Sequence, residues 1–475
     1  MIAVHTNGSG GSPMNRHSTR AAHAALGDRM RAIAGAMLVA MAALGGVCPA
    51  AAQVPAPPQD RPIALTGATI HTITNGVIQN GTIVFENGVI TAVGTNVAVP
   101  ANAQRIDVTG RHIYPGLIDA YSAMGLQEIG AVDVTLDMNE LGDFTPNVRA
   151  ELAVNPESRH IGTARSNGVL VTLTTPSGGL VSGLSAALML DGWTWESMTL
   201  KSGAALNVEW PDPRGPRRFP WMQQGGNDED QPTYAEQVQT LRDIFATARA
   251  YRDAQASGRP HDTDSRWEAM VPVVNGETPV IISAYSVQQI QDALAFAEAE
   301  GIRVILRGAD DALFVADHLA AKRIPVLVTS TMASPGRAWQ GYDTNYSLPA
   351  KLHAKGVPFA IVGDNSASYT HRLPWEAGVA VAYGLPEEEA LRAVTIYPAR
   401  FLGIDDRVGS LEPGKDATLL ITTGNPLDYL ADIEQAYVQG RAIDMNDIFR
   451  QLYHKYSEKV RQTRVTADEV TQQQQ

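Results

Sequence analysis

A regular alternation of apolar runs and amphipathic stretches between residues 113 and 402 constrains the fold of this chain more than any other feature. Short apolar runs at residues 168–174, 279–284 and 302–306 have the length and the β-branched content of buried strands. Stretches with helical periodicity follow the second and third runs after only a few residues. Strands that alternate with helices across short loops pair in parallel, so the pattern predicts a parallel α/β architecture.

Composition sets the size and the class of the molecule. The chain has 475 residues, of which 44% are hydrophobic and 18% charged. This is enough for a barrel of roughly 250 residues or more together with a smaller satellite domain. The formal net charge of −13, without a long basic run, argues against nucleic-acid binding. The single cysteine excludes intrachain disulfides and cysteine-based metal sites.

The first 52 residues have the pattern of an export signal. Arg29 and Arg31 precede an apolar stretch at residues 32–47, and the small residues at 50–52 resemble an Ala-x-Ala cleavage site. A stretch of about 16 residues is short for a transmembrane anchor, which is the alternative interpretation. We expect residues 1–52 to be a signal peptide and 53–62 a linker. The mature protein would then be periplasmic or secreted, without stable membrane insertion.

Two separate β-rich segments flank the predicted barrel. Residues 63–112 contain short β-like runs and hairpin turn signals such as Asn80-Gly81, but a sheet made from them alone has unfinished edges. Residues 403–445 contain the string GSLEPGKDATLLI, which ends in a further apolar run. The sequence of residues 446–475 predicts a terminal helix followed by a disordered polar tail.

The stretch that joins the first β-rich segment to the barrel reads Tyr114-Pro-Gly-Leu-Ile-Asp-Ala-Tyr-Ser-Ala123. Together with the GSLEPGKDATLLI string, it resembles the amidohydrolase superfamily, metal-dependent hydrolases that include imidazolonepropionase and dihydroorotase. The resemblance covers roughly residues 63–444. It implies a (β/α)8 TIM-like barrel at 113–402 and a small composite β-sandwich domain built from the N- and C-terminal segments. It also implies hydrolysis of a non-peptide carbon–nitrogen bond in a small molecule, with zinc or another divalent ion.

The metal ligands of the family are missing from the corresponding positions. The resemblance places the two histidines of the first barrel strand at Tyr121 and Ala123. It places the strand-four Lys or Glu near Asn207, the strand-five His at Ser283 and the strand-six His at Arg307. None of these residues supplies an imidazole nitrogen, and Arg307 carries a permanent positive charge. We therefore expect a divergent member of the family with no metal cofactor.

Asp364, at the end of the eighth strand, is the carboxylate that the resemblance retains as the catalytic base. It can serve as a residual base, or it can pair with Arg307 in the space that a metal ion would occupy. The residues expected to contact a small-molecule ligand are Tyr121, Asn207, Ser283, Arg307 and His371.

Residues 210–230 interrupt the alternation with four prolines and an acidic Gly-Gly-Asn-Asp-Glu-Asp run. This insertion is either a solvated surface loop or a lid or partner-contact loop that uses Trp210, Phe219 and Trp221.

Two functions remain open from the sequence. The first is an exported hydrolase of this family that has lost its binuclear metal site, so that any activity is metal-free or weak. The second is a pseudoenzyme that binds a ligand or acts as a partner subunit, in a homo-oligomer or with an intact homologue. A closed polar pocket at the expected site would favour ligand binding. An open site in which Asp364 has a raised pKa would favour residual catalysis.

Overall fold

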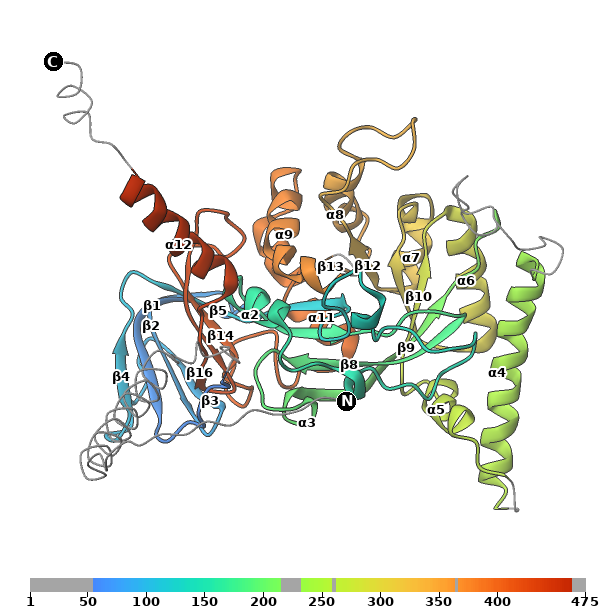
Figure 1. The fold of residues 1–475 in the computed structure, drawn as a ribbon, viewed down its shortest axis with the longest axis horizontal. Coiled ribbons are helices and arrows are strands. Elements are labelled where there is room, and N and C mark those ends of the chain that lie inside the picture. The colour runs from blue at the N-terminus through green and yellow to red at the C-terminus, as the bar shows by residue number, and fades with distance from the viewer. Residues whose placement is uncertain (1–53, 215–231, 259–261, 364–365, 464–475) are drawn as a thin grey trace, which may run out of the picture. The chain divides into compact units, whose positions relative to one another are not determined.

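The computed structural model describes residues 54–214, 232–258, 262–363 and 366–463, which form part of one compact unit that starts at Val54. The predicted signal peptide lies outside the described residues. Two eight-stranded sheets organise the unit (Figure 1). Among the described residues, no helix is both long and apolar enough to cross a membrane.

The first sheet is built from both ends of the chain. Its order is β16-β15-β14-β5-β1-β2-β3, with β4 paired to β1. The strands are β1 (Ile63–His71), β2 (Val77–Glu86), β3 (Val89–Gly94), β4 (Gln104–Asp107), β5 (His112–Pro115), β14 (Leu419–Thr422), β15 (Ile433–Val438) and β16 (Arg441–Ala442). Strand β14 pairs antiparallel with β5, so the C-terminal strands complete an edge that the N-terminal strands leave open. The predicted composite β-domain is confirmed.

The second sheet has the order β13-β12-β11-β10-β9-β8-β7-β6. Its strands are β6 (Leu117–Ser122), β7 (Val169–Thr174), β8 (Val181–Met189), β9 (Thr199–Glu209), β10 (Val280–Ala284), β11 (Val304–Gly308), β12 (Val326–Thr329) and β13 (Phe359–Val362). The first and last strands approach each other, since the Gly363 amide, just after β13, donates to Asp119 Oδ1 on β6 at 3.2 Å. This nearly closed sheet confirms the barrel.

One strand of the barrel departs from the expected parallel pattern. Strand β8 is antiparallel to both β7 and β9, whereas the remaining pairs along the sheet are parallel. Only residues 175–180 separate β7 from β8. A parallel connection needs a crossover of a dozen residues or more, so this short link permits only a reversal of direction.

Gly116 is the point at which the chain passes from one sheet to the other. It lies between β5 and β6, which belong to different sheets. A Cβ atom at this position would lie 2.8 Å from Leu170 Cβ on β7. The glycine therefore allows the chain to turn directly against the barrel without a linker.

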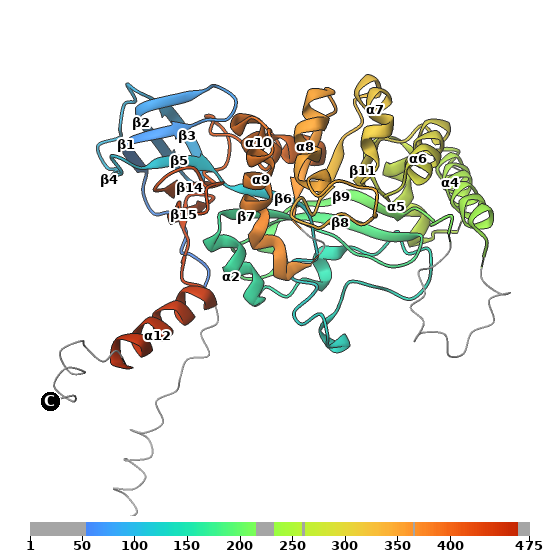
Figure 2. The same cartoon turned by 90° about the horizontal axis from the view of Figure 1, so that it is seen from above.

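The described part of the chain also contains eleven helices, most of which pack around the barrel strands. They are α2 (Arg159–Ser166), α3 (Trp195–Met198), α4 (Tyr234–Ala256), α5 (Ser265–Val274), α6 (Val287–Glu300), α7 (Ala316–Lys322), α8 (Thr344–Ala354), α9 (Leu373–Ala382), α10 (Glu387–Ala393), α11 (Ile396–Leu402) and α12 (Ile448–Thr463). Short 3-10 turns are η1 (Asp133–Thr135), η2 (Ala150–Ala153), η5 (Ala312–Val315) and η6 (Ala367–Arg372). Figure 2 shows α6, α7 and α8 beside one another along the parallel strands, whereas α12 extends away from both sheets.

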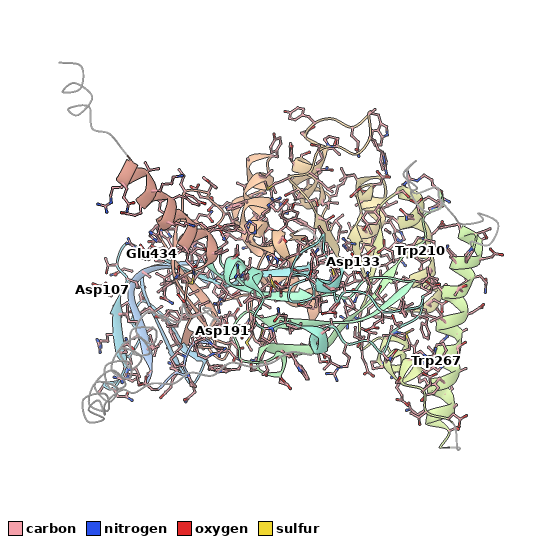
Figure 3. All side chains as sticks on the ribbon, viewed as in Figure 1. Asp107, Asp133, Asp191, Trp210, Trp267 and Glu434 are labelled. Atoms are coloured by element: carbon pink, nitrogen blue, oxygen red, sulfur yellow. The ribbon has the colours of Figure 1, made fainter. Side chains whose placement is uncertain are left out.

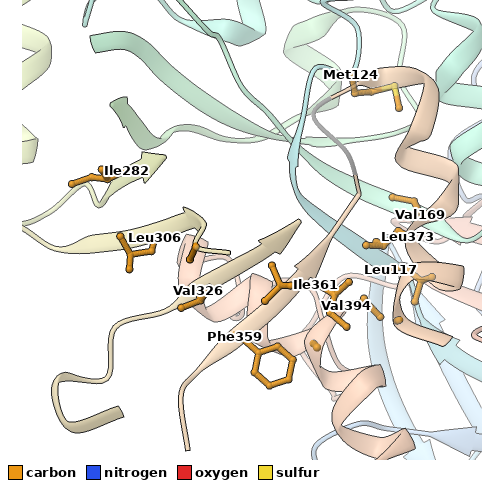
Figure 4. Close-up of a cluster of buried hydrophobic side chains, with 14 of the residues drawn as sticks. Leu117, Met124, Val169, Ile282, Leu306, Val326, Phe359, Ile361, Leu373 and Val394 are labelled. Carbon is orange, nitrogen blue, oxygen red and sulfur yellow. The ribbon is translucent and has the colours of Figure 1, made fainter. Parts of the chain in front are cut away.

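Local sequence explains where these helices begin and end. Helix α6 starts at a capping box formed by Ser286 and Gln289, and it ends at Gly301, whose φ is 66°. The largest core cluster lies between helices and strands; Figure 4 shows Ile282, Leu306 and Phe359 within it. The inner face of the barrel carries a second apolar cluster, so the barrel is filled rather than hollow.

Candidate functional site

Polar side chains gather where the barrel strands end, above an apolar interior layer that includes Ile281, Ile305 and Leu327. The register of the strands pairs Ser283 on β10 with Glu209 on β9 and with Arg307 on β11. The interacting set, which we call the Arg307 cluster, consists of Tyr121, Glu209, Ser283, Tyr285 and Arg307. The cluster lies at the C-terminal ends of the barrel strands, where barrel enzymes have their active sites.

Arg307 is at the centre of the cluster and is largely buried, with 9% of its surface exposed. Its Nη1 donates to Tyr285 Oη at 2.8 Å and to Ser283 Oγ at 3.3 Å. The guanidinium carbon lies 4.2 Å from the centroid of the Tyr121 ring, within cation–π range. Two hydroxyl groups and an aromatic face therefore hold this cation in one position.

Glu209 is the carboxylate of the cluster. Desolvation by the pocket wall raises its pKa, and both the Arg307 charge and a hydrogen bond with Ser283 oppose that rise. Its side chain is nevertheless exposed at the mouth of the barrel. A carboxylate with a raised pKa beside a fixed cation is typical of acid–base sites.

Sequence reasoning missed Glu209 and named Asn207 instead. The structure buries Asn207, whose Nδ2 donates to Gly183 O at 3.0 Å and to Ser185 Oγ at 2.7 Å, so that it binds β8. Glu209 lies two residues further along β9, level with Ser283. The sequence offered one signal for Glu209: it is a carboxylate two positions beyond Asn207, at the end of the same strand.

A pocket of about 1160 Å³ opens beside the cluster. Its charged lining residues are Glu209, Asp212, Arg214, Arg307, Asp310 and Arg337, and its aromatic ones are Trp210, Tyr234 and Tyr285. Arg337 Nη1 lies 2.6 Å from Asp311 Oδ1, and Arg214 pairs with Asp212 at 3.2 Å. The pocket is therefore polar, contains both signs of charge and is large enough for a small molecule.

Trp210, at the edge of this pocket, is a core residue rather than an exposed contact. It is 2% exposed, its Nε1 donates to Tyr234 Oη at 3.1 Å, and its ring packs edge-on against Phe296. Figure 3 labels Trp210. The lid or partner role proposed for Trp210 is wrong, because a buried tryptophan has no surface to offer a partner. Phe219 and Trp221 lie outside the described residues.

Asp119 is fully buried between β6 and β13. Its Oδ1 accepts hydrogen bonds from the Tyr121 amide at 3.3 Å and the Gly363 amide at 3.2 Å. Burial raises the pKa of Asp119 to about 7, although these hydrogen bonds oppose the rise. Asp364, the predicted base, follows Gly363 directly but lies outside the described residues.

His371 is placed apart from the Arg307 cluster. Its ring packs edge-on against Trp375, with 5.6 Å between centroids, and lies 5.7 Å from the Phe449 ring. Burial lowers the pKa of His371. The structure thus brings Tyr121, Ser283 and Arg307 together as expected but leaves His371 in an aromatic group beside α12.

Among the described residues, the side chains at the expected metal position do not suit a divalent ion. Within the described part of the chain, no three His, Cys, Asp or Glu side chains lie close enough together to hold a metal. In the Arg307 cluster the donors are one carboxylate and three hydroxyl groups, and a guanidinium stands among them. A guanidinium has no lone pair to donate, and its charge repels a divalent cation.

Comparison with known proteins decides the family. The sequence pattern of the amidohydrolase family matches residues 284–446. A solved amidohydrolase from Thermotoga maritima MSB8 shares the fold with a TM-score of 0.72 and 27% identity, over 80% of this chain and 99% of its own. This chain belongs to the amidohydrolase superfamily.

Sequence similarity to several amidohydrolases and imidazolonepropionases is consistent with this assignment. The imidazolonepropionase of Mesorhizobium japonicum is 26% identical over 389 residues, covering 73% of this chain and 87% of that enzyme. The imidazolonepropionase of Geobacillus kaustophilus is 28% identical over 388 residues, covering 73% and 84%. Amidohydrolase tasK of Hapsidospora irregularis is 24% identical over 393 residues, but the chain covers only 40% of its length. The predicted membership of the superfamily is confirmed.

Proposed function

We propose that this chain is an exported hydrolase that cleaves a non-peptide carbon–nitrogen bond of a small molecule without a binuclear metal site. The observation that carries the proposal is the juxtaposition of Glu209 and Arg307 across Ser283 at the barrel mouth. Similarity to imidazolonepropionases supports a cyclic amide or a related compound as the substrate. Export rests on the N-terminal pattern and predicts a mature chain that begins near residue 53.

The geometry suits general-base hydrolysis. Glu209, as the carboxylate, takes a proton from water while the water oxygen attacks the carbonyl carbon of the substrate. The carbonyl oxygen becomes an oxyanion, and the fixed guanidinium of Arg307 stabilises the negative charge. When the carbon–nitrogen bond breaks, its electron pair stays on nitrogen, which takes the proton back from Glu209.

Each group is suited to its step by its surroundings. The raised pKa of Glu209 makes its carboxylate a stronger base than an ordinary carboxylate. Tyr285 and Ser283 hold Arg307 in place, so little reorganisation is needed when the oxyanion forms.

The second candidate is a ligand-binding pseudoenzyme. It is favoured by the contacts of Arg307 with Ser283, Tyr285 and Tyr121, which engage the guanidinium within the protein. In this case the pocket binds a small polar molecule and carries out no turnover, and the chain acts as a subunit of a homo-oligomer or beside an intact homologue.

Turnover of a panel of cyclic amides, including imidazolonepropionate, in the presence of a chelator tests the proposal. The wild-type chain should hydrolyse at least one compound, and Glu209→Gln and Arg307→Met should each reduce kcat by roughly 100-fold or more. Glu298→Gln is the matched control, because Glu298 lies in an exposed ion pair with Lys322 on the surface.

The outcomes separate the two candidates. Activity that a chelator abolishes, or that survives both cluster variants, would overturn the proposed mechanism. Saturable binding of a panel compound without turnover, weakened in Arg307→Met, would instead establish the ligand-binding candidate.

A further inference from the structure

Helix α12 (Ile448–Thr463) carries a row of exposed apolar side chains along one side. The row contains Phe449, Leu452, Tyr453, Tyr456 and Val460, which are 54%, 37%, 71%, 54% and 62% exposed. Spacings of three and four residues place all of them on one face of the helix. The adjoining loop adds Tyr429 and Leu430, which are 78% and 84% exposed. A group of large exposed apolar side chains on one side of a helix indicates an interaction site.

The row continues into the body of the protein through ring contacts. The rings of Phe449 and His371, of His371 and Trp375, and of Trp375 and Tyr429 lie 5.7, 5.6 and 5.9 Å apart. The base of α12 is fixed in addition by Arg450, whose Nη2 donates to Ile433 O at 3.0 Å. The helix is therefore anchored at its start and extends away from both sheets (Figures 1 and 2), and its apolar side chains beyond Phe449 are exposed.

Basic side chains border this face on both sides. At 3.6 residues per turn, Lys455 and Lys459 flank one edge, and Arg450 and Arg461 flank the other. The one acidic residue of the helix, Glu458, lies opposite the apolar row, where it pairs with Arg461. This helix is locally positive in a chain whose net charge is −13.

An apolar, tyrosine-rich face between two basic borders has the chemistry of a helix that lies in a membrane interface. The apolar side chains enter the boundary between headgroups and acyl chains, and lysines and arginines reach the anionic headgroups. Pairing with α12 of a second copy is disfavoured, because both borders are basic and would face each other with like charge. The charge pattern complements an anionic surface along both edges.

We propose that α12 docks this protein on the surface of an anionic phospholipid bilayer, lying in the plane of the interface without crossing it. Burial of the apolar row in the interface favours binding, and the two basic borders favour anionic lipid over neutral lipid. This docking is independent of the chemistry of the Arg307 cluster.

Co-sedimentation of the full chain with vesicles tests the proposal. Vesicles of phosphatidylcholine with phosphatidylglycerol should bind the protein, vesicles of phosphatidylcholine alone should bind it far less, and added salt should weaken binding. Lys455→Gln with Lys459→Gln should weaken binding to the anionic vesicles roughly 25-fold, about fivefold for each lysine. Tyr453→Ser with Tyr456→Ser should weaken it on the order of tenfold or more.

The matched control is Gln451→Ser with Gln462→Ser, on the opposite face, and it should leave binding unchanged. Circular dichroism and the thermal midpoint should be the same for all three double variants, because their side chains are exposed. Binding that persists in the lysine and tyrosine variants would come from elsewhere in the chain and would overturn the proposal. So would a lipid-independent dimer, seen by sedimentation velocity, that the tyrosine variant dissociates, since the occupant of the face would then be a second copy.

Discussion

Replacement of Asp191 by asparagine should destabilise the protein strongly, because this carboxylate pairs with one buried and one partly buried guanidinium group. Asp191 Oδ1 lies 3.0 Å from Arg165 Nη1, and Oδ2 lies 3.1 Å from Arg441 Nη1. The side chains of Asp191, Arg165 and Arg441 are 1%, 4% and 16% exposed. The ion pairs connect α2 to the region of β16, and Figure 3 shows Asp191 between the composite sheet and the barrel.

The expected cost follows from burial. Loss of one partner of a buried ion pair leaves an uncompensated charge and typically costs about 3–5 kcal/mol of the free energy of unfolding. Arg165, which is buried, and Arg441, which is partly buried, would both lose this partner, so the upper part of this range is expected. Asparagine retains the shape of aspartate, which separates the loss of charge from the creation of a cavity.

Urea unfolding followed by tryptophan fluorescence measures this cost, with Glu298→Gln as the control. Glu298 and Lys322 are 65% and 53% exposed, so the control should lose less than about 1 kcal/mol. A loss in Asp191→Asn no larger than that of the control would refute the reasoning that the buried charges depend on one another.

Further predictions concern pH and packing. Ser283→Ala removes a hydrogen bond that lowers the pKa of Glu209, so the acid limb of the profile of kcat/KM against pH should move to higher pH. An unchanged acid limb would exclude Glu209 as the base. Burial raises the pKa of Asp119 from 3.8 to about 7, so the folded protein binds this proton more tightly than the unfolded chain does. The free energy of unfolding should therefore fall as pH rises from about 4 through 7. Urea titrations of Asp119→Asn at several pH values should lack this pH-dependent fall. Gly116→Ala would place a Cβ 2.8 Å from a side chain of β7 and should cost roughly 1–3 kcal/mol by thermal unfolding, whereas Gly336→Ala, in open space, should be nearly neutral.

Local pattern predicted many of the strands and helices, whereas the closed barrel and the composite domain were predicted from the family resemblance. Apolar runs with turn signals lie in the strands of both sheets, and residues 114–123 and 409–421 carry the resemblance that joins the two ends into one domain. The reversal at β8 was not predicted, because periodicity identifies a strand but does not give its direction. The shortness of residues 175–180 was the physical clue.

The site was harder to predict than the fold. Tyr121, Ser283 and Arg307 were found because the resemblance assigns them the positions of the family's metal ligands, and each is the second-last residue of its strand. The choice between Asn207 and Glu209 depends on how far β9 is shifted relative to β10, and this register is set by pairing in three dimensions. The sequence shows both Asn207 and Glu209 on this strand, but spacing alone does not choose between them.

The metal content of the purified protein, measured by plasma mass spectrometry after dialysis against a weak chelator, tests the central claim most directly. Arg307 and its hydroxyl partners stand at the positions that the resemblance gives to metal ligands. We therefore expect metal far below one equivalent per chain. Zinc, manganese or iron near one equivalent or more would contradict the account and would show that the chain holds a metal site of a different composition.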